Sequence, residues 1–77
     1  MKIAFIGAGN MSEAIISGIL KQGVFSAADI TASDPLIERR NYMGDTYGVE
    51  VSGNNREAVE GVDIVVIIIN INIKSFR

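Results

Sequence analysis

The hydrophobic pattern of the chain changes period several times. Residues 2–6 form an apolar run that is too short for a helix and stops at Gly7, which is typical of a strand buried on both faces of a parallel sheet. From Met11 onward apolar residues recur at helical spacing, and Gly23 follows as a helix stop. We expect the small and apolar stripe of this helix to pack on the sheet. Its members are Met11, Ala14, Ile15, Gly18 and Ile19.

A second strand and a second helix are predicted next. Residues 30–33 form a short apolar strand. Asp34 then supplies a helix cap, Pro35 suits the first helical position, and Gly48 follows as a stop. The apolar positions of this helix are Leu36, Met43 and Tyr47.

The third strand is brief and the fourth is long. Val49 and Val51 alternate with polar neighbours, as in a half-buried strand. Asn54 and Glu57 have the spacing of a capping box, which predicts a short helix ending near Gly61. The fourth strand is predicted from the continuous β-branched run at 64–69, and strict alternation at 70–73 continues it.

This order of elements predicts an α/β fold. Right-handed crossovers arrange the four strands as a parallel sheet of order 3-2-1-4 with helices on both faces, which is half of a doubly wound, Rossmann-like nucleotide-binding domain. We expect residues 1–77 to form a single domain of this kind. The fourth strand would lie at an edge of the sheet, with a hydrophobic face left uncovered.

Composition narrows the possible partners. The formal net charge of −2 gives no basic footprint for nucleic acid or an anionic membrane, so we expect neither partner. The chain has no Cys and no His, which disfavours a disulfide framework and a transition-metal site. The acidic residues are scattered rather than paired, and we assign no catalytic residue. The apolar runs are short for a leader or a membrane span, which indicates a soluble, cytoplasmic protein.

Candidate chemistry lies where the first strand meets the first helix. The spacing Gly7-x-Gly9-x-x-Ser12 matches the fingerprint of a dinucleotide pyrophosphate site, in which the glycines allow a tight turn and close approach of the phosphates. Amides of Asn10 and Met11 would point at the pyrophosphate from the positive end of the helix. Glu13 must then point away from it. The alternative is a tight turn without a ligand.

Asp34 follows the second strand, at a distance from the glycines typical of an acidic residue that binds the adenosine ribose. An ordinary helix cap is an equally good interpretation. The same carboxylate would repel a 2′-phosphate, whereas Arg39 and Arg40 could offset that repulsion if either reaches back across its helix. The alternative for both arginines is a solvated helix face, so NADP and NAD both remain candidate cofactors.

These residues together resemble the N-terminal domain of the pyrroline-5-carboxylate reductase family. The resemblance covers residues 1 to about 67 and is carried by the segments 5–11, 13–16, 32–35, 47–49, 55–59 and 61–63. Members of that family reduce pyrroline-5-carboxylate to proline with NADPH or NADH, in proline biosynthesis. The resemblance implies cofactor contacts at Gly7, Ala8, Gly9, Asn10, Met11, Asp34 and Asn55. For Asn55 the alternative is a helix cap shared with Asn54.

The chain departs from that family in two respects. Residues 68–71 read Ile-Ile-Asn-Ile where the family has Ala-Val-Lys-Pro, near the expected nicotinamide. The family's helical C-terminal domain, which forms the dimer and contributes much of the substrate site, is absent. We therefore expect the NAD(P)-binding portion of an oxidoreductase that is not catalytic alone. The alternative is a non-catalytic interaction module that forms homo-oligomers through the exposed fourth strand.

Overall fold

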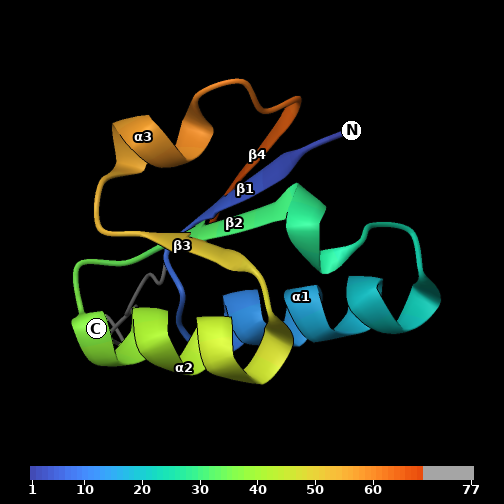
Figure 1. Ribbon diagram of the computed structural model, residues 1–77, viewed down its shortest axis with the longest axis horizontal. Coiled ribbons are helices and arrows are strands. Elements are labelled where there is room, and N and C mark those ends of the chain that lie inside the picture. Colours follow the sequence, from blue (N-terminus) through green and yellow to red (C-terminus); the bar gives the residue numbers. More distant parts are fainter. Residues whose placement is uncertain (69–77) are drawn as a thin grey trace, which may run out of the picture.

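A parallel sheet lies at the centre of the computed structural model, which describes residues 1–68 (Figure 1). In chain order the elements are β1 (Ile3–Ile6), α1 (Asn10–Gln22), the short 3₁₀ helix η1 (Ala27–Asp29), β2 (Ile30–Ser33), α2 (Ile37–Tyr47), β3 (Glu50–Ser52), α3 (Asn55–Val59) and β4 (Ile64–Ile67). The strand order is β3-β2-β1-β4 and all pairs are parallel. The predicted order 3-2-1-4 is confirmed.

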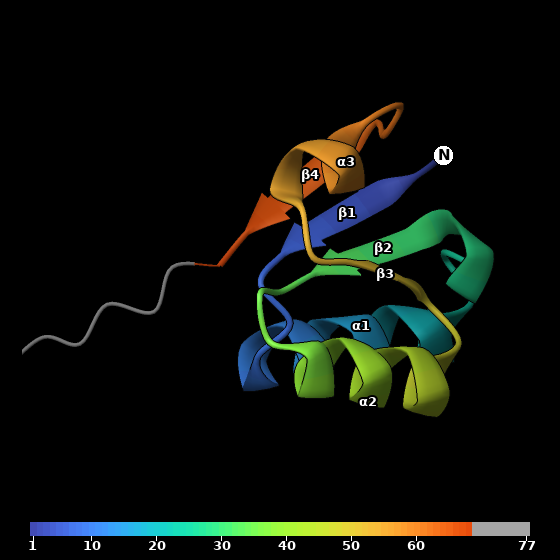
Figure 2. The ribbon, with the colours of Figure 1, turned by 60° about the vertical axis from the view of Figure 1, so that its left-hand side comes forward.

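Helices cover both faces of the sheet, as predicted. α1 and α2 lie side by side on one face and α3 lies on the other (Figure 2). The main core lies between the sheet and the α1–α2 layer, where its largest apolar side chains are completely buried. These are Phe5, Ile16, Ile30 and Met43.

The register brings the carboxyl ends of three strands together. Ile6 at the end of β1 is paired with Ser33 at the end of β2 and with Ile67 at the end of β4. The loop after β1, the turn after β2 and the chain after β4 therefore meet at one edge of the sheet. Ligands of open α/β sheets bind at this kind of edge.

The face of α1 that packs on the sheet is not the predicted one. Ser12 and Ile16 are its buried residues, whereas Met11 is 61% exposed and Ile15 is 39% exposed. Of the predicted stripe, Ile19 is packed against the core; Ala14 and Gly18 are exposed. The prediction was wrong because apolar residues occupy two overlapping stripes of this helix, and helical spacing does not choose between them.

α2 begins later than predicted. Leu36, not Asp34, occupies the N-cap position, and Pro35 lies before the helix. Oδ1 of Asp34 accepts a hydrogen bond from the amide of Leu36 at 2.9 Å, which closes a turn in place of the cap. Both predicted helix stops are confirmed, since Gly23 and Gly48 have left-handed backbone angles with φ of 72° and 73°.

The predicted capping box of α3 forms only in part. Oδ1 of Asn54 accepts from the amide of Glu57 at 3.1 Å, as a cap does. The Glu57 carboxylate does not return to the amide of Asn54, because it accepts from the Ser52 hydroxyl at 3.1 Å while that hydroxyl accepts from the Asn54 amide at 3.0 Å. The Ser52 hydroxyl thus accepts the Asn54 amide in place of the Glu57 carboxylate.

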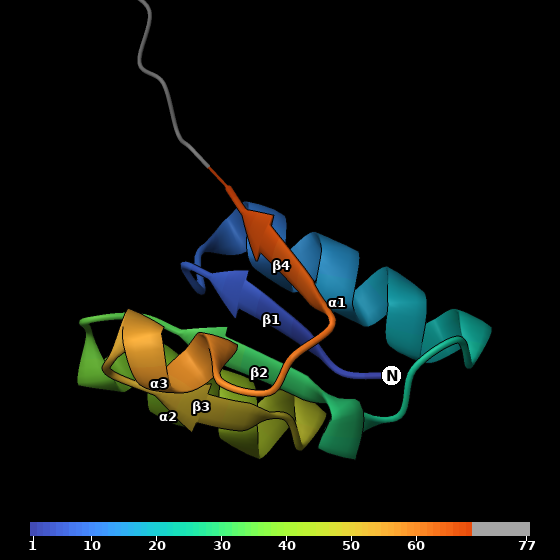
Figure 3. The ribbon, with the colours of Figure 1, turned by 90° about the horizontal axis from the view of Figure 1, so that it is seen from above.

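β4 is an edge strand in the described part of the chain, where it pairs with β1 alone (Figure 3). Its side chains are poorly covered, as predicted: Val65 is 45% exposed and Ile67 is 64% exposed. The predicted continuation of this strand through residues 69–73 lies outside the described residues. Within residues 1–68, no helix has the length and apolar character needed to cross a membrane.

Candidate functional site

The loop after β1 turns sharply at Gly7. Its φ of 102° is a conformation that side-chain-bearing residues rarely adopt, and its amide donates to the carbonyl of Ser33 at 2.8 Å. Gly9 is different, because its backbone is extended (φ −78°, ψ −169°) and a Cβ added there would meet no other atom of the described residues within 4 Å. Gly7 therefore serves the turn, while Gly9 leaves the surface of the loop open.

A pocket of about 400 Å³ lies in front of the first turn of α1. Its lining residues are Gly7, Gly9, Asn10, Met11, Ser12 and Ile68. The amide of Glu13 donates to the carbonyl of Gly9 at 3.0 Å, so the preceding amides of the helix lie before its first intrahelical hydrogen bond. Asn10, Met11 and Ser12, whose amides precede that bond, line the pocket. The amide donors of the first turn and the positive end of the helix dipole therefore lie beside it, which suits an anion.

Ser12 packs the first turn of α1 against the sheet. Only 1% of the Ser12 surface is exposed. The residue lies one turn before Ile16 on the buried face of α1. A small side chain at this position lets the helix begin close to the sheet, as the glycine spacing predicted.

Asp34 holds the glycine loop in place. Its Oδ2 accepts from the amide of Ala8 at 3.0 Å, and its Oδ1 accepts from the amide of Leu36. The interpretation of Asp34 as the cap of α2 is wrong, because the bonds of this carboxylate tie the loop after β1 to the turn after β2. The side chain is half-buried and follows β2 at the carboxyl edge of the sheet.

Asn55 reaches the same edge from the opposite face of the sheet. It is the first residue of α3, and its Oδ1 accepts from the hydroxyl of Ser33 at 2.6 Å. Asn54 caps this helix, so the interpretation of Asn55 as a shared cap is wrong. Ser33 connects the glycine loop to α3, since its carbonyl accepts from the amide of Gly7 and its hydroxyl donates to Asn55.

Neither arginine of α2 lies on a solvated helix face. Nε of Arg39 donates to the carbonyl of Ala8 at 2.6 Å. Nη1 of Arg40 donates to the carbonyls of Asp34 at 2.8 Å and Pro35 at 3.1 Å. Both side chains therefore reach back to the loops at the carboxyl edge of the sheet, and the solvated alternative is wrong for each of them.

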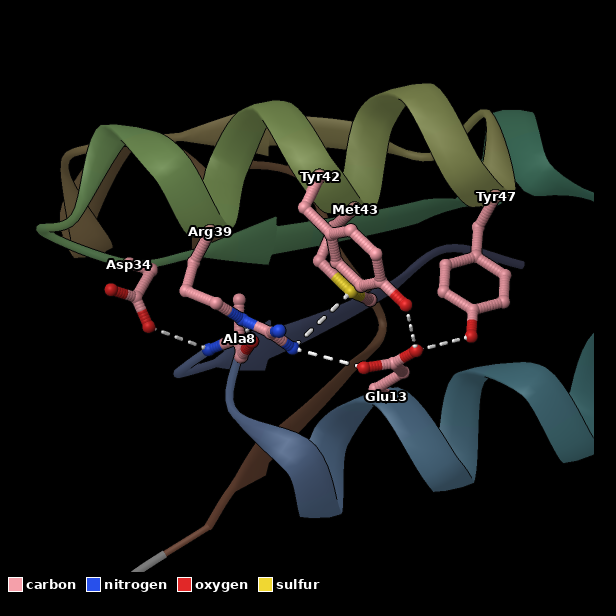
Figure 4. A network of polar contacts seen from close by, with 7 residues as sticks. All are labelled: Ala8, Glu13, Asp34, Arg39, Tyr42, Met43 and Tyr47. Carbon is pink, nitrogen blue, oxygen red and sulfur yellow. Dashed lines mark hydrogen bonds and ion pairs between the residues drawn. The ribbon is translucent and has the colours of Figure 1, made fainter.

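Glu13 is the centre of a polar network between α1 and α2 (Figure 4). Its Oε1 pairs with Nη2 of Arg39 at 3.1 Å, and its Oε2 accepts from the hydroxyls of Tyr42 and Tyr47, each at 2.6 Å. The guanidinium of Arg39 also lies 4.8 Å from the centroid of the Tyr42 ring. The carboxylate of Glu13 thus faces α2 rather than an anion in front of α1. Sequence reasoning missed this network.

The network makes the stability of the fold depend on pH in the alkaline range. Hydrogen bonds from Tyr42 and Tyr47 lower the pKa of Glu13, and the bond to Glu13 raises the pKa of Tyr47 from 10.0 to about 12. Above pH 10 the unfolded chain loses this phenol proton while the folded chain retains it. We expect the free energy of unfolding to fall between pH 10 and about 12.

Urea denaturation across this pH range measures the effect. A double variant, Tyr42→Phe with Tyr47→Phe, is the control, because it keeps the aromatic rings and every other titratable group. Its stability should fall less steeply with pH than that of the wild type. Parallel curves for the two proteins would contradict the predicted role of the phenols.

No group of three or more His, Cys, Asp or Glu side chains within residues 1–68 is arranged to hold a metal ion.

Comparison with known proteins identifies the family to which the chain belongs. Residues 2–74 match the family described as NADP oxidoreductase coenzyme F420-dependent. Pyrroline-5-carboxylate reductase of Pseudomonas aeruginosa is 47% identical over 66 residues, which are 86% of this chain and 24% of that protein. The enzyme of the same name from Vibrio alginolyticus is 42% identical over 66 residues, with the same shares of 86% and 24%.

The fold of a known structure agrees with these matches. A pyrroline-5-carboxylate reductase from Coxiella burnetii superposes with a TM-score of 0.83 at 26% identity, covering 88% of this chain and 25% of that one. This chain thus spans only about a quarter of the length of the relatives that it matches. The Rossmann-like fold and the resemblance predicted from the sequence are both confirmed, and the chain belongs to the NADP oxidoreductase, coenzyme F420-dependent family.

Proposed function

We propose that this chain is a dinucleotide-binding domain that takes NADP or NAD at the carboxyl edge of its sheet. The observation that carries the proposal is the pocket at the first turn of α1, which combines the first-turn residues of the helix with the open surface of Gly9. The family description, which names NADP, supports the same ligand.

The proposed contacts follow the edge of the sheet. The pyrophosphate lies against Gly7, Gly9, Asn10 and Met11, which line the pocket. Ala8 acts by shaping the loop, because it is completely buried and both of its backbone polar groups are already bonded. The adenosine half extends toward two side chains at the end of β2, one bonded to Ala8 and the other to Ser33. These are Asp34 and Asn55.

We further propose that the domain serves a reductase that converts pyrroline-5-carboxylate to proline. The relatives in the comparison carry the name of that enzyme. A bound nicotinamide would supply the hydride, and the chain would hold and orient the cofactor. The pocket lining offers glycines, an amide, a thioether, a buried hydroxyl and an aliphatic side chain, none of which is a strong proton donor. We therefore propose that residues 1–77 bind cofactor without turning over substrate.

Calorimetric titration of the chain with NADPH and with NADH tests the proposal. Saturable binding of at least one of them is expected, together with competition by ADP, which shares the diphosphate. A steady-state assay with pyrroline-5-carboxylate should show no oxidation of the cofactor. If neither dinucleotide binds, the proposed function is wrong. Turnover near that of an intact reductase would overturn the proposal that the chain is not catalytic alone.

A second candidate function is self-association through β4. Ile67 is 64% exposed on this edge strand, and apolar strand edges pair readily with other strands. We expect Ile67→Lys to prevent association without unfolding the chain, because the added charge lies in solvent. Val24→Lys is a matched control, since Val24 is 65% exposed between α1 and η1.

Light scattering at high micromolar concentration measures both variants against the wild type. Oligomers should be seen for the wild type and for Val24→Lys but not for Ile67→Lys. A wild-type chain that stays monomeric would contradict this second function.

A further inference from the structure

The two backbone polar groups of Ala8 are both held by side chains from the β2–α2 region (Figure 4). The carboxylate of Asp34 accepts from the amide, and Nε of Arg39 donates to the carbonyl at 2.6 Å. Ala8 lies between Gly7 and Gly9, so this anchoring acts at the middle of the glycine loop.

Arg39 is itself fixed from several directions. Its Nη2 pairs with Glu13 at 3.1 Å and lies 3.8 Å from the sulfur of Met43, while the ring of Tyr42 covers the guanidinium. Only 26% of its side chain is exposed. A guanidinium confined in this way can hold a carbonyl in one direction, and a charged donor makes that hydrogen bond a strong one.

The direction of the Ala8 carbonyl decides the direction of the next amide. No peptide bond among residues 1–68 is cis, and across a planar trans peptide the N–H points opposite to the C=O. The Ala8 carbonyl faces α2, so the N–H of Gly9 faces away from α2. The pocket lies on that other side, because its lining includes Gly9 and Ile68, and Ile68 follows β4.

We infer that Arg39 is a positioning residue of the dinucleotide site: its bond to the Ala8 carbonyl turns the Gly9 amide toward the pocket. The inference rests on the proposed function for its ligand. Rotation of the Ala8–Gly9 peptide unit changes ψ of Ala8 and φ of Gly9, and glycine at position 9 accepts φ of either sign at little steric cost. A rotated unit would present a carbonyl oxygen to the phosphates in place of a donor. Arg39 selects the donor orientation before the ligand arrives.

The variant Arg39→Met tests this inference, and Arg56→Met is its matched control. Both remove one positive charge, but Arg56 is exposed on α3, on the opposite face of the sheet. The first readout is the ¹H–¹⁵N resonance of the Gly9 amide without ligand. It should shift in Arg39→Met and stay in place in Arg56→Met. A role in stability alone would not single out this amide.

The second readout is the affinity for NADH and NADPH by calorimetry. Loss of a charge-assisted hydrogen bond that orients the site should weaken binding by about tenfold in Arg39→Met. Arg56→Met should bind as the wild type does. Arg39→Lys, which keeps the charge and one donor, should recover part of both readouts.

The outcomes distinguish the positioning role of Arg39 from the binding of a dinucleotide by the chain. A Gly9 amide that does not move in Arg39→Met overturns the inference, whether or not a dinucleotide binds. Wild-type affinity in Arg39→Met overturns it as well. A wild-type chain that binds neither dinucleotide overturns the proposed function and the ligand named here. If thermal unfolding shows that Arg39→Met is not folded, both readouts are taken from Arg39→Lys. An unchanged Gly9 amide resonance together with unchanged affinity in Arg39→Lys then overturns the inference.

Discussion

The variant Gly9→Val is expected to lose dinucleotide binding while keeping its fold. Valine can adopt the extended backbone of Gly9 without strain, and its Cβ would meet no other atom of residues 1–68 within 4 Å. That empty space is part of the pocket, so the side chain would occupy the volume in which the phosphates approach the loop. We expect the affinity for NADPH and NADH to fall by about a hundredfold or more, because the helix amides can no longer reach the diphosphate.

Gly18→Val is the matched control for this prediction. Gly18 also belongs to α1 and is exposed, and an added Cβ would meet no atom of residues 1–68 beyond its own helix backbone within 4 Å, but Gly18 does not line the pocket. Calorimetry should show wild-type affinity for Gly18→Val, and thermal unfolding should show that both variants fold. Undiminished affinity in Gly9→Val would mean that the diphosphate does not bind in front of α1.

The strand order could be predicted because it depends on local patterns and on one general rule. β1, β2 and β4 are short apolar segments separated by helical or turn segments, and parallel strands joined in this way cross over with one hand. No long-range side-chain contact has to be known to reach this result. The pocket could be predicted for the same reason, since five of its lining residues lie within 7–12.

The packed face of α1 could not be derived from the same pattern. Ile15 and Ile16 are neighbours of the same type, and each belongs to a stripe with helical spacing. The structure buries the stripe of Ile16 because Ser12, one turn earlier, faces the sheet at the start of the helix. The choice depends on how the glycine loop enters the helix, which is a three-dimensional property.

The contacts of Arg39 were beyond sequence reasoning for a different reason. They join residues far apart in the chain, since the residue numbers of Arg39 and Glu13 differ by 26 and those of Arg39 and Ala8 by 31. Such pairs form only after α1 and α2 have packed side by side. The position of Asp34 after β2 was predictable, but its bond to the Ala8 amide depends on the register that pairs Ile6 with Ser33.

Ile16→Ala is expected to be the most destabilising of the substitutions considered in α1. Ile16 is completely buried in the core with Phe5, Ile30 and Met43. Truncation to alanine leaves a cavity and should lower the free energy of unfolding by about 2–5 kcal/mol. A domain of this length has a total stability of roughly 4–12 kcal/mol, so urea denaturation should show a large shift or complete unfolding.

Ile15→Ala is the control, because it makes the same chemical change at the next position of the same helix. Ile15 is 39% exposed, and its truncation should cost less than about 1 kcal/mol. The comparison also tests the site, since Ser12 and Ile16 lie one turn apart on the same face. If Ile15→Ala were the more costly change, α1 would be rotated about its axis. Its first-turn amides would then not face the pocket, and the proposed binding of a diphosphate there would lose its geometric basis.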